Sequence, residues 1–352
     1  MFCVSLFSGC GGLDIGLEKA GFKILLANDN DEYCKTSYLL NWPKANFHLG
    51  SVSELSKEVL SEYLGSNLNN IDLLAGGPPC PPYSKSRFYR KDMPRGLEDP
   101  AGWETLSGYF DVLSILKPKA FLLENVPGLV YKIHKDAFDY IMNRATELGY
   151  TCSYKVVNAA NYGVPQIRER LIFIGTREGI FEFPEETFIN PEKNAGFLDS
   201  SKKNWKTVGK AIGDLDTEEN ASDEGHYAGG KHHELLKEVP PGDNYLYFTE
   251  NRGYPTPLFK WRSRYWSFLL KLSPDKPSWT IQARRSNNMG PFHWRNRILR
   301  IEEIKRIQTF PDNWILFGTI ERQWRQIGNA VPPLLAATIG QAIFRHLQQY
   351  NN

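Results

Sequence analysis

The chain has 352 residues, 41% of them hydrophobic and 23% charged, which is the composition of an ordinary globular protein with one large or two moderate domains. No basic segment followed by a long apolar run opens the chain, and no apolar run nears the ~18 residues of a membrane helix. We therefore expect an intracellular, cytoplasmic protein that does not bind membranes. The five cysteines form no Cys-x-x-Cys pair and the seven histidines lack ligand spacing, so neither a disulfide framework nor a metal site is predicted.

The first half of the chain alternates short apolar runs with amphipathic segments. This succession of βα units predicts an α/β fold with a doubly wound, mostly parallel sheet. The expected strands are Cys3–Leu6, Lys23–Ala27, Ile71–Ala75, Ala120–Leu123, Tyr154–Val157 and Arg170–Gly175, and the expected helices are Leu13–Ala20, Glu32–Asn41, about Leu106–Leu116 and Phe138–Leu148.

The pattern changes at about Glu178. Residues 184–260 are rich in Pro, Gly, Asn, Asp and Glu and show no long amphipathic period. Helical character returns over Ile301–Thr309 and Leu334–Gln348. We expect two domains: a first domain formed by residues 1–177 together with 325–352, and a second, smaller one formed by residues 178–324.

A cysteine follows the third predicted strand within the turn Gly76-Gly77-Pro78-Pro79-Cys80. A lone cysteine is more often a buried small hydrophobe than a reactive group. Here, however, prolines stand on both sides of it, and they fix the backbone and remove amide donors. Because ligands of open α/β sheets bind at the carboxyl ends of the strands, Cys80 is a candidate nucleophile at the edge of a pocket.

Other polar residues adjoin predicted strands. Glu124 follows Ala120–Leu123, and Arg168 and Arg170 precede the apolar run Leu171-Ile172-Phe173-Ile174. Taken singly, the glutamate could cap a helix and the arginines could form structural ion pairs. Together with Cys80 they place a thiol, an acid and two cations at strand ends.

A glycine-rich loop, with Gly9, Gly11 and Gly12, joins the first strand to the first helix. Such a loop lets backbone amides and a helix N-terminus approach an anionic group. Asp29 stands twenty positions after Gly9, the usual spacing for a carboxylate that accepts from a ribose hydroxyl. The pair fits either a dinucleotide or S-adenosylmethionine, and an ordinary tight turn with a surface acid is the simpler alternative.

Five short motifs occur in one order along the chain, and together they resemble those of the DNA cytosine-5 methyltransferases over residues 2 to about 176 and about 277 to 345. They are Phe7–Gly12, Gly76–Cys80, Glu124-Asn125-Val126, Gln166–Arg170 and Gly328-Asn329-Ala330-Val331-Pro332. The resemblance implies methyl transfer from S-adenosylmethionine to carbon 5 of cytosine in a specific double-stranded DNA sequence, with a role in restriction-modification or host defence. It also assigns residues 178–324 to target recognition.

The resemblance further implies a role for each motif. Cys80 would add covalently to carbon 6 of a flipped cytosine, Glu124 would protonate ring nitrogen 3, and Arg170, with Arg168 as the second choice, would steady the base carbonyl and orient Glu124. Phe7 would pack on the cofactor and Asp29 would hold its ribose. The full set of expected cofactor contacts is Phe7, Gly9, Cys10, Gly11, Gly12, Asp29, Asn30, Ser51, Val52, Pro79, Asn329, Ala330 and Val331.

Three positions depart from the family pattern. Asn30 stands where an aromatic residue is frequent, Ser51 where an aspartate near the adenine is frequent, and Pro81 where glutamine is common. The segment Tyr83–Pro100 carries five basic residues directly after the candidate nucleophile, and we expect it to close over the DNA strand as a lid.

Positive charge is concentrated between Arg252 and Arg306. This segment has thirteen basic residues against three acidic ones in a chain whose net charge is only +2. Aromatic residues are interleaved with the charges, among them Trp261, Tyr265, Trp266, Phe268, Trp279, Phe292 and Trp294. Such a pattern predicts contacts with the phosphate backbone, although a merely solvated face would have the same composition.

Three alternative functions stay open on the sequence alone. An RNA cytosine-5 methyltransferase would use the same chemistry, a nicotinamide-linked oxidoreductase would explain only Gly9 to Asp29, and an inactive DNA-binding regulator would leave Cys80, Glu124 and Arg170 without a role. For the favoured function we expect a monomer that acts on double-stranded DNA, with a restriction endonuclease or defence system as a companion.

Overall fold

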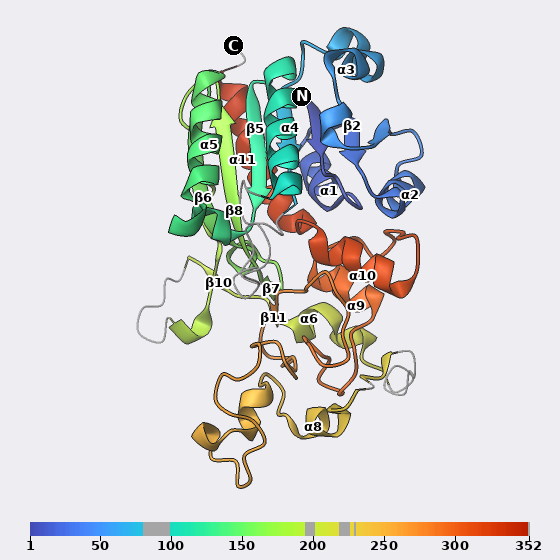
Figure 1. Cartoon of the computed structure of the whole chain (residues 1–352), viewed down its shortest axis with the longest axis vertical. Helices are drawn as coiled ribbons and strands as arrows, with labels where there is room; N and C mark the ends of the chain where they lie inside the picture. The colour runs from blue at the N-terminus through green and yellow to red at the C-terminus, as the bar shows by residue number, and fades with distance from the viewer. Residues whose placement is uncertain (80–98, 194–200, 218–225, 229, 351–352) are drawn as a thin grey trace.

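The computed structural model describes residues 1–79, 99–193, 201–217, 226–228 and 230–350. The upper part in Figure 1 is a central sheet with helices on both faces, and the lower part has short helices joined by long irregular segments. We call the described residues 201–217, 226–228 and 230–310, which belong to this lower part, the lower lobe.

The sheet has seven strands in the order β3-β2-β1-β4-β5-β8-β6. The five strands from β3 to β5 are parallel, whereas β8 runs antiparallel to both β5 and β6. The predicted doubly wound, mostly parallel sheet is therefore confirmed. Its strands are β1 (Phe2–Leu6), β2 (Lys23–Asp29), β3 (Phe47–Leu49), β4 (Leu73–Gly76), β5 (Ala120–Asn125), β6 (Thr151–Asn158) and β8 (Glu169–Thr176).

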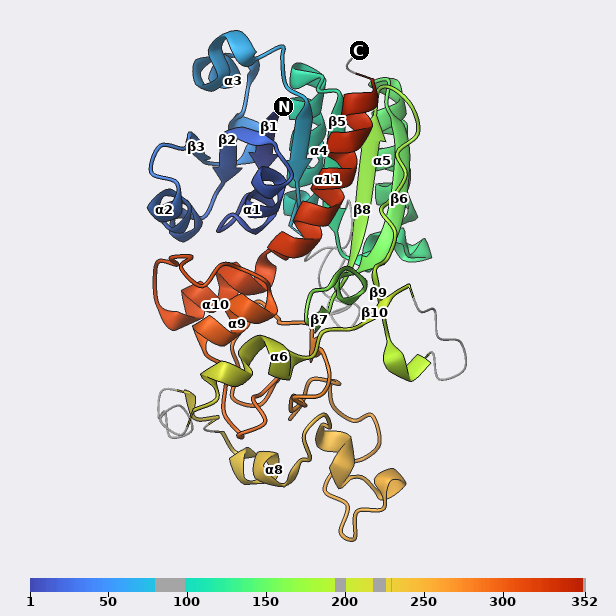
Figure 2. The same ribbon diagram turned by 180° about the vertical axis from the view of Figure 1, so that it is seen from behind.

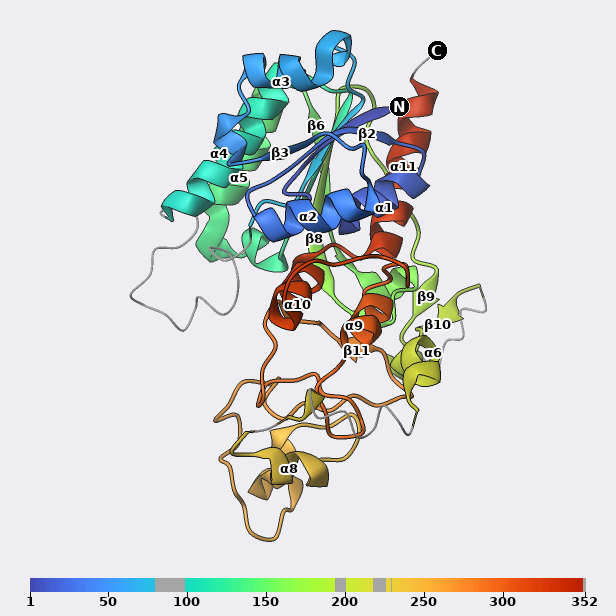
Figure 3. The same cartoon turned by 90° about the vertical axis from the view of Figure 1, so that its right-hand side faces the viewer.

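Helices cover both faces of this sheet (Figure 3). One hydrophobic cluster joins the sheet to α3, α4 and α5, and a second joins the opposite face to α1 and α11. Local signals explain their limits: the side chain of Asp31 accepts from the Tyr33 amide at 2.8 Å and so caps α2, which ends just before Pro43. The helices are α1 (Gly12–Lys19), α2 (Glu32–Asn41), α3 (Lys57–Leu64), α4 (Pro100–Leu116), α5 (Lys135–Glu147) and α11 (Pro333–Gln349).

Helix α11 crosses the back of the sheet, as Figure 2 shows. Among the described residues, Ile320–Gln349 is the one stretch that is long and apolar enough to span a membrane by length and composition, which inspection of the sequence did not single out. It consists of two helices, and the apolar side of α11, with Leu335, Ile339 and Ile343, is buried in the second cluster. We therefore interpret α11 as a core helix.

The lower lobe is organised around a third hydrophobic cluster rich in aromatic residues, including Tyr245, Phe248, Phe268 and Phe292. This cluster also contains Cys10 and Ile15 from the upper part, so the glycine-rich loop rests directly on it. The elements outside the main sheet are β7 (Gln166–Ile167), β9 (Phe188–Ile189), β10 (Lys203–Asn204), α6 (Val208–Ile212), α8 (His233–Glu238), β11 (Ser278–Trp279), α9 (Ile301–Ile307) and α10 (Ile320–Asn329).

Helix α10 was not predicted. Thr319 caps its N-terminus by accepting from the Arg322 amide, and Trp324 and Ile327 on its buried side join the third cluster. The expected domain boundary between residues 324 and 325 thus falls inside a helix. Two short parallel strands, β7 and β11, tie the upper part to the lower lobe.

Candidate active site

Two strands of the sheet, β1 and β4, end in the same row, and β5 extends two residues beyond that row. Leu6 of β1 is paired with Gly76 of β4, and Gly76 is paired with Leu123 of β5. Gly77, which follows β4, and Glu124, the last residue but one of β5, therefore lie at one edge of the sheet. This register brings together motifs that are far apart in the sequence.

Glu124 and Arg170 form an ion pair at this edge. Asn125 of β5 is paired with Leu171 of β8, which sets the preceding Arg170 beside the end of β5. Nε of Arg170 lies 2.8 Å from Oε1 of Glu124, and the side chains are only 14% and 8% exposed. The two residues that the motif comparison placed in one site are thus in direct contact.

Burial raises the pKa of Glu124, and the positive charges of Arg170 and Arg168 oppose that rise. Burial and the two positive charges therefore shift the pKa of this carboxyl group in opposite directions. Such a group can keep or release a proton with small changes around it, which suits an acid that must protonate a ring nitrogen.

The turn that leads to Cys80 packs directly on this pair. A Cβ added to Gly77 would lie 2.9 Å from Oε2 of Glu124, so only glycine fits without displacing the carboxylate. Nδ2 of Asn125 donates to the carbonyl oxygen of Pro78 at 3.2 Å. Cys80, Pro81 and the predicted lid up to residue 98 lie outside the described residues. Asn125 was not singled out as a site residue, although it adjoins Glu124 in the sequence.

Backbone carbonyl groups hold the side chain of Arg168. Its side chain is fully buried, and its guanidinium donates to the carbonyl oxygens of Ile281, Gly328 and Ala330 at 2.8–3.1 Å. This placement favours Arg170 over Arg168 as the arginine that would contact the base. The side-chain directions of two arginines in one short motif could not be read from the sequence.

The glycine-rich loop is closed by the C-terminal motif. Gly11, with φ 90°, stands at the N-terminus of α1, and a Cβ added to Gly12 would lie 2.5 Å from the carbonyl oxygen of Val331. Phe7 also has a left-handed backbone, with φ 54°, which is uncommon for an aromatic residue and typical of functional loops. A Cβ at Gly9 would meet no atom within 4 Å. The structure therefore sets the loops at residues 7–12 and 329–331 against each other.

Asp29 lies at the end of β2 beside this loop. Its two carboxylate oxygens accept from the amides of Gly9 and Asp31, both at 2.9 Å. Asn30 is exposed next to it, whereas Ser51 donates to Oε1 of Glu104 at 2.7 Å and Val52 is buried. The residues expected to contact the ribose and the adenine thus lie at or just after the ends of the neighbouring strands β2 and β3.

Asp14 is a buried acid next to the glycine-rich loop that was not predicted from the sequence. Asp14 on α1 accepts from the hydroxyl groups of Ser5 at 2.5 Å and Tyr38 at 2.8 Å. Burial raises the pKa of Asp14 to about 6, although these hydrogen bonds lower it. Because Asp14 follows the glycines by only two positions, its position in α1 was a signal that could have been used.

Fewer side chains of the basic segment 252–306 are available for contacts with phosphates than the number of its positive charges indicates. Many of its cations lie in ion pairs with acids outside the segment, such as Arg295 with Asp216, Arg306 with Asp214 and Arg285 with Glu321. A continuous run from Trp261 to Trp266 is exposed, and Arg284 is exposed as well. The rings of Trp266 and Trp279 lie edge to face, with centroids 5.6 Å apart.

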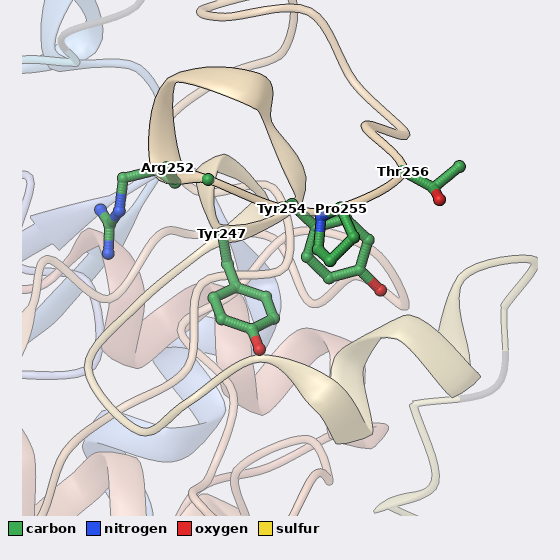
Figure 4. Close-up of a pocket in the computed structure, with 6 residues that line it drawn as sticks. Tyr247, Arg252, Tyr254, Pro255 and Thr256 are labelled. Carbon is green, nitrogen blue, oxygen red and sulfur yellow. The ribbon is translucent and has the colours of Figure 1, made fainter.

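An open pocket of about 540 Å³ lies in the lower lobe and is lined by Tyr247, Arg252, Gly253, Tyr254, Pro255 and Thr256. Figure 4 shows that the side chains of Tyr247, Arg252 and Thr256 point in different directions. Cofactor pockets instead have a few polar groups that converge on the ligand. The site at the edge of the sheet is therefore the better candidate for chemistry.

The chain is similar to known methyltransferases over almost its whole length. The type II methyltransferase M.SacI of Streptomyces achromogenes is 36% identical over 367 residues, which cover 98% of this chain and 93% of that protein. The type II methyltransferase M.MthTI of Methanothermobacter thermautotrophicus is 33% identical and covers 99% and 98%. A prophage-encoded DNA modification methyltransferase of E. coli shares the fold, with a TM-score of 0.67, 23% identity and 99% coverage of both chains. The family model for C-5 cytosine-specific DNA methylases matches residues 1–345, and the chain belongs to that family.

Proposed function

We propose that this protein transfers a methyl group from S-adenosylmethionine to carbon 5 of cytosine within a specific double-stranded DNA sequence. The observation that carries the proposal is the Glu124–Arg170 ion pair, on which the turn leading to Cys80 is packed. The type II names of M.SacI and M.MthTI support a role in restriction-modification, with a companion endonuclease. We expect the protein to act as a monomer in the cytoplasm.

The chemistry needs covalent help because carbon 5 of cytosine is a poor nucleophile. The Cys80 thiolate adds to carbon 6 of a base flipped out of the duplex and so raises the electron density at carbon 5. Glu124 holds a proton at ring nitrogen 3 while Arg170 orients its carboxyl group. Loss of the carbon 5 proton and expulsion of the thiolate then restore the aromatic ring.

The cofactor would lie between the loop at residues 7–12 and the loop at residues 329–331. Bound there, S-adenosylmethionine supplies the methyl group as a sulfonium. The open space at Gly9 and the carboxylate of Asp29 fit a ribose and its chain, and the N-terminus of α1 fits a carboxylate. Phe7 would pack on one face of the cofactor.

The DNA would contact the lower lobe. The exposed run 261–266 combines two tryptophans and a tyrosine with Arg262 and Arg264, which suits phosphates and bases together. Trp279 is paired with Ile167, three positions before Arg170, so the Trp266–Trp279 pair adjoins the catalytic edge.

A mapping experiment tests the proposal. DNA from a host that expresses the protein should carry 5-methylcytosine in one short motif, and the purified protein should form a covalent adduct with that motif carrying 5-fluorocytosine. Cys80→Ser should abolish both results while the fold persists. Methylation of transfer RNA but not of duplex DNA would favour the RNA alternative, and binding of DNA without methylation or an adduct would favour the inactive regulator.

A further inference from the structure

Arg168 occupies an unusual position for a charged residue. It lies between β7 and β8, is fully buried, and is the largest of the fully buried side chains in the described part of the chain. Its backbone is fixed, because its amide donates to Oδ1 of Asn158 at 3.2 Å and its carbonyl oxygen accepts from the Ala159 amide at 2.9 Å. Burying a cation is costly unless its donors are well paired, so this site is under strong geometric constraint.

The three carbonyl oxygens that hold its guanidinium come from two separate segments. Ile281 follows β11 and precedes the exposed Arg284, on the side of the molecule assigned to DNA. Gly328 and Ala330 lie at the end of α10, on either side of Asn329, in the loop assigned to the cofactor. The planar guanidinium can satisfy these oxygens together in only one relative arrangement of the two segments.

Two buried glutamines, Gln166 and Gln308, form a second hydrogen-bonded connection between the segment at Ile281 and the end of α10. Oε1 of Gln166 accepts from the Ile281 amide at 3.0 Å, and its Nε2 donates to Oε1 of Gln308 at 3.0 Å. Nε2 of Gln308 in turn donates to the carbonyl oxygen of Ile327 at 2.8 Å. All these polar groups are paired with one another, so a shift of one segment breaks hydrogen bonds in the other.

The segment that follows β11 and the C-terminal part of α10 are also in direct van der Waals contact. A Cβ added to Gly328 would lie 2.5 Å from the carbonyl oxygen of Gln282, and the Trp324 indole donates to that same oxygen at 2.8 Å. Displacement of the segment after β11 is therefore passed to α10 and to the loop that follows it.

We propose that Arg168 is a positioning residue that couples DNA binding to cofactor binding. DNA that fixes residues 281–284 also selects the arrangement of residues 328–330 that holds the cofactor, and the cofactor favours the DNA-binding arrangement by the same factor. This inference rests on the proposed function.

The test measures binding of S-adenosylhomocysteine by calorimetry, without and with a duplex of the mapped motif. For the wild type we expect the duplex to tighten binding by about 5-fold or more, as is typical of coupled sites. Arg168→Lys keeps the positive charge but loses the planar fork, so the ratio of the two dissociation constants should fall towards one. Arg170→Lys, two positions away, should slow methylation and leave the ratio at the wild-type value.

Gln308→Met provides a second, milder variant that keeps the side-chain volume and removes two hydrogen bonds. Gln308→Met should lower the ratio of the two dissociation constants, and a cooperative thermal transition would show that its fold is intact. If Arg168→Lys does not fold, the result for Gln308→Met tests the inference. The inference is overturned if folded Arg168→Lys or folded Gln308→Met keeps the wild-type ratio of the two dissociation constants. It is also overturned if the duplex does not tighten cofactor binding by the wild type. Absence of methylation by the wild type would instead remove the proposed function.

Discussion

The carboxylate of Glu124 and the guanidinium of Arg170 meet across two antiparallel strands, 2.8 Å apart and largely shielded from water. Because Gly77 packs on the other carboxylate oxygen, the acid is fixed from two sides, beside the segment 76–79 that precedes Cys80 in the sequence. Its orientation is thus set before any base arrives, which is the condition for efficient general acid catalysis.

Glu124→Gln should slow the methyl-transfer step by ~100-fold or more, because an amide cannot supply the proton at ring nitrogen 3. Single-turnover rates with a saturating duplex measure this directly, and DNA affinity should change much less. Since burial raises the pKa of Glu124, the wild-type rate should fall as pH rises through that pKa, and the variant should lack this dependence. An unchanged single-turnover rate would remove Glu124 from the mechanism.

Gly12→Ala should weaken cofactor binding. The new methyl group would lie 2.5 Å from the carbonyl oxygen of Val331, and this backbone can yield only by displacing the loop at residues 329–331. Overpacking of this kind costs about 1–3 kcal/mol of folding stability. The displaced loop should in addition bind S-adenosylhomocysteine more weakly, which calorimetry measures. Gly213→Ala is the matched control, because a Cβ there would meet nothing within 4 Å. Equal affinities for both variants and the wild type would contradict the proposed location of the cofactor.

Asp14→Asn should change how stability depends on pH. The folded-state pKa of Asp14 is raised from 3.8 to about 6, so the folded protein binds this proton more tightly than the unfolded chain does. Its contribution is therefore fully present below about pH 4 and is lost as pH rises through 6, by at most about 3 kcal/mol. Urea unfolding at several pH values should show that Asp14→Asn lacks this loss, whereas Asp136→Asn, at an exposed position, should follow the wild type. Parallel curves for Asp14→Asn and the wild type would show that the carboxyl group is not buried as described.

Arg284→Ala should weaken DNA binding on every sequence and reduce the slope of log affinity against log salt by ~0.9, the value for one lost phosphate contact. Arg285→Ala should have a smaller effect, because that side chain is held by Glu321 at 3.2 Å. Changing both residues should flatten the slope by ~1 to 2 and leave the methylated motif unchanged. Salt titrations on cognate and scrambled duplexes measure these slopes. A new target motif, or the same slope in the wild type and both variants, would show that the phosphate assignment is wrong.

Much of the sheet could be predicted because its strands are short apolar runs and its helices have clear periodicity. The expected helix Glu32–Asn41 matches α2, and every expected strand lies within an observed one except Ile71–Ala75, which begins two residues before β4. The three-residue strand β3 was missed because it is too short to show a period. Helix α10 was missed although Thr319 is a good capping residue, because its last residues were interpreted only as part of the Gly328–Pro332 motif.

The site could be predicted only as far as strand ends determine it. Pairing of β5 with β8 brings Glu124 and Arg170 together, as their positions next to strands indicated. The direction of Arg168 depends on carbonyl groups from residues 281–330, and the pairing of Arg306 depends on Asp214 and Asp312. A count of charges in one window of sequence contains no information about partners outside it.

The packing of α11 against α1 has a consequence for biosynthesis. The two helices bury one face of the sheet together, yet α11 is translated long after α1 and after the whole lower lobe. Until α11 emerges from the ribosome, apolar side chains such as Leu17 on α1 and Ile174 on β8 lack their final cover. We therefore expect the nascent chain to stay open and aggregation-prone until α11 has been synthesised and can pack against α1.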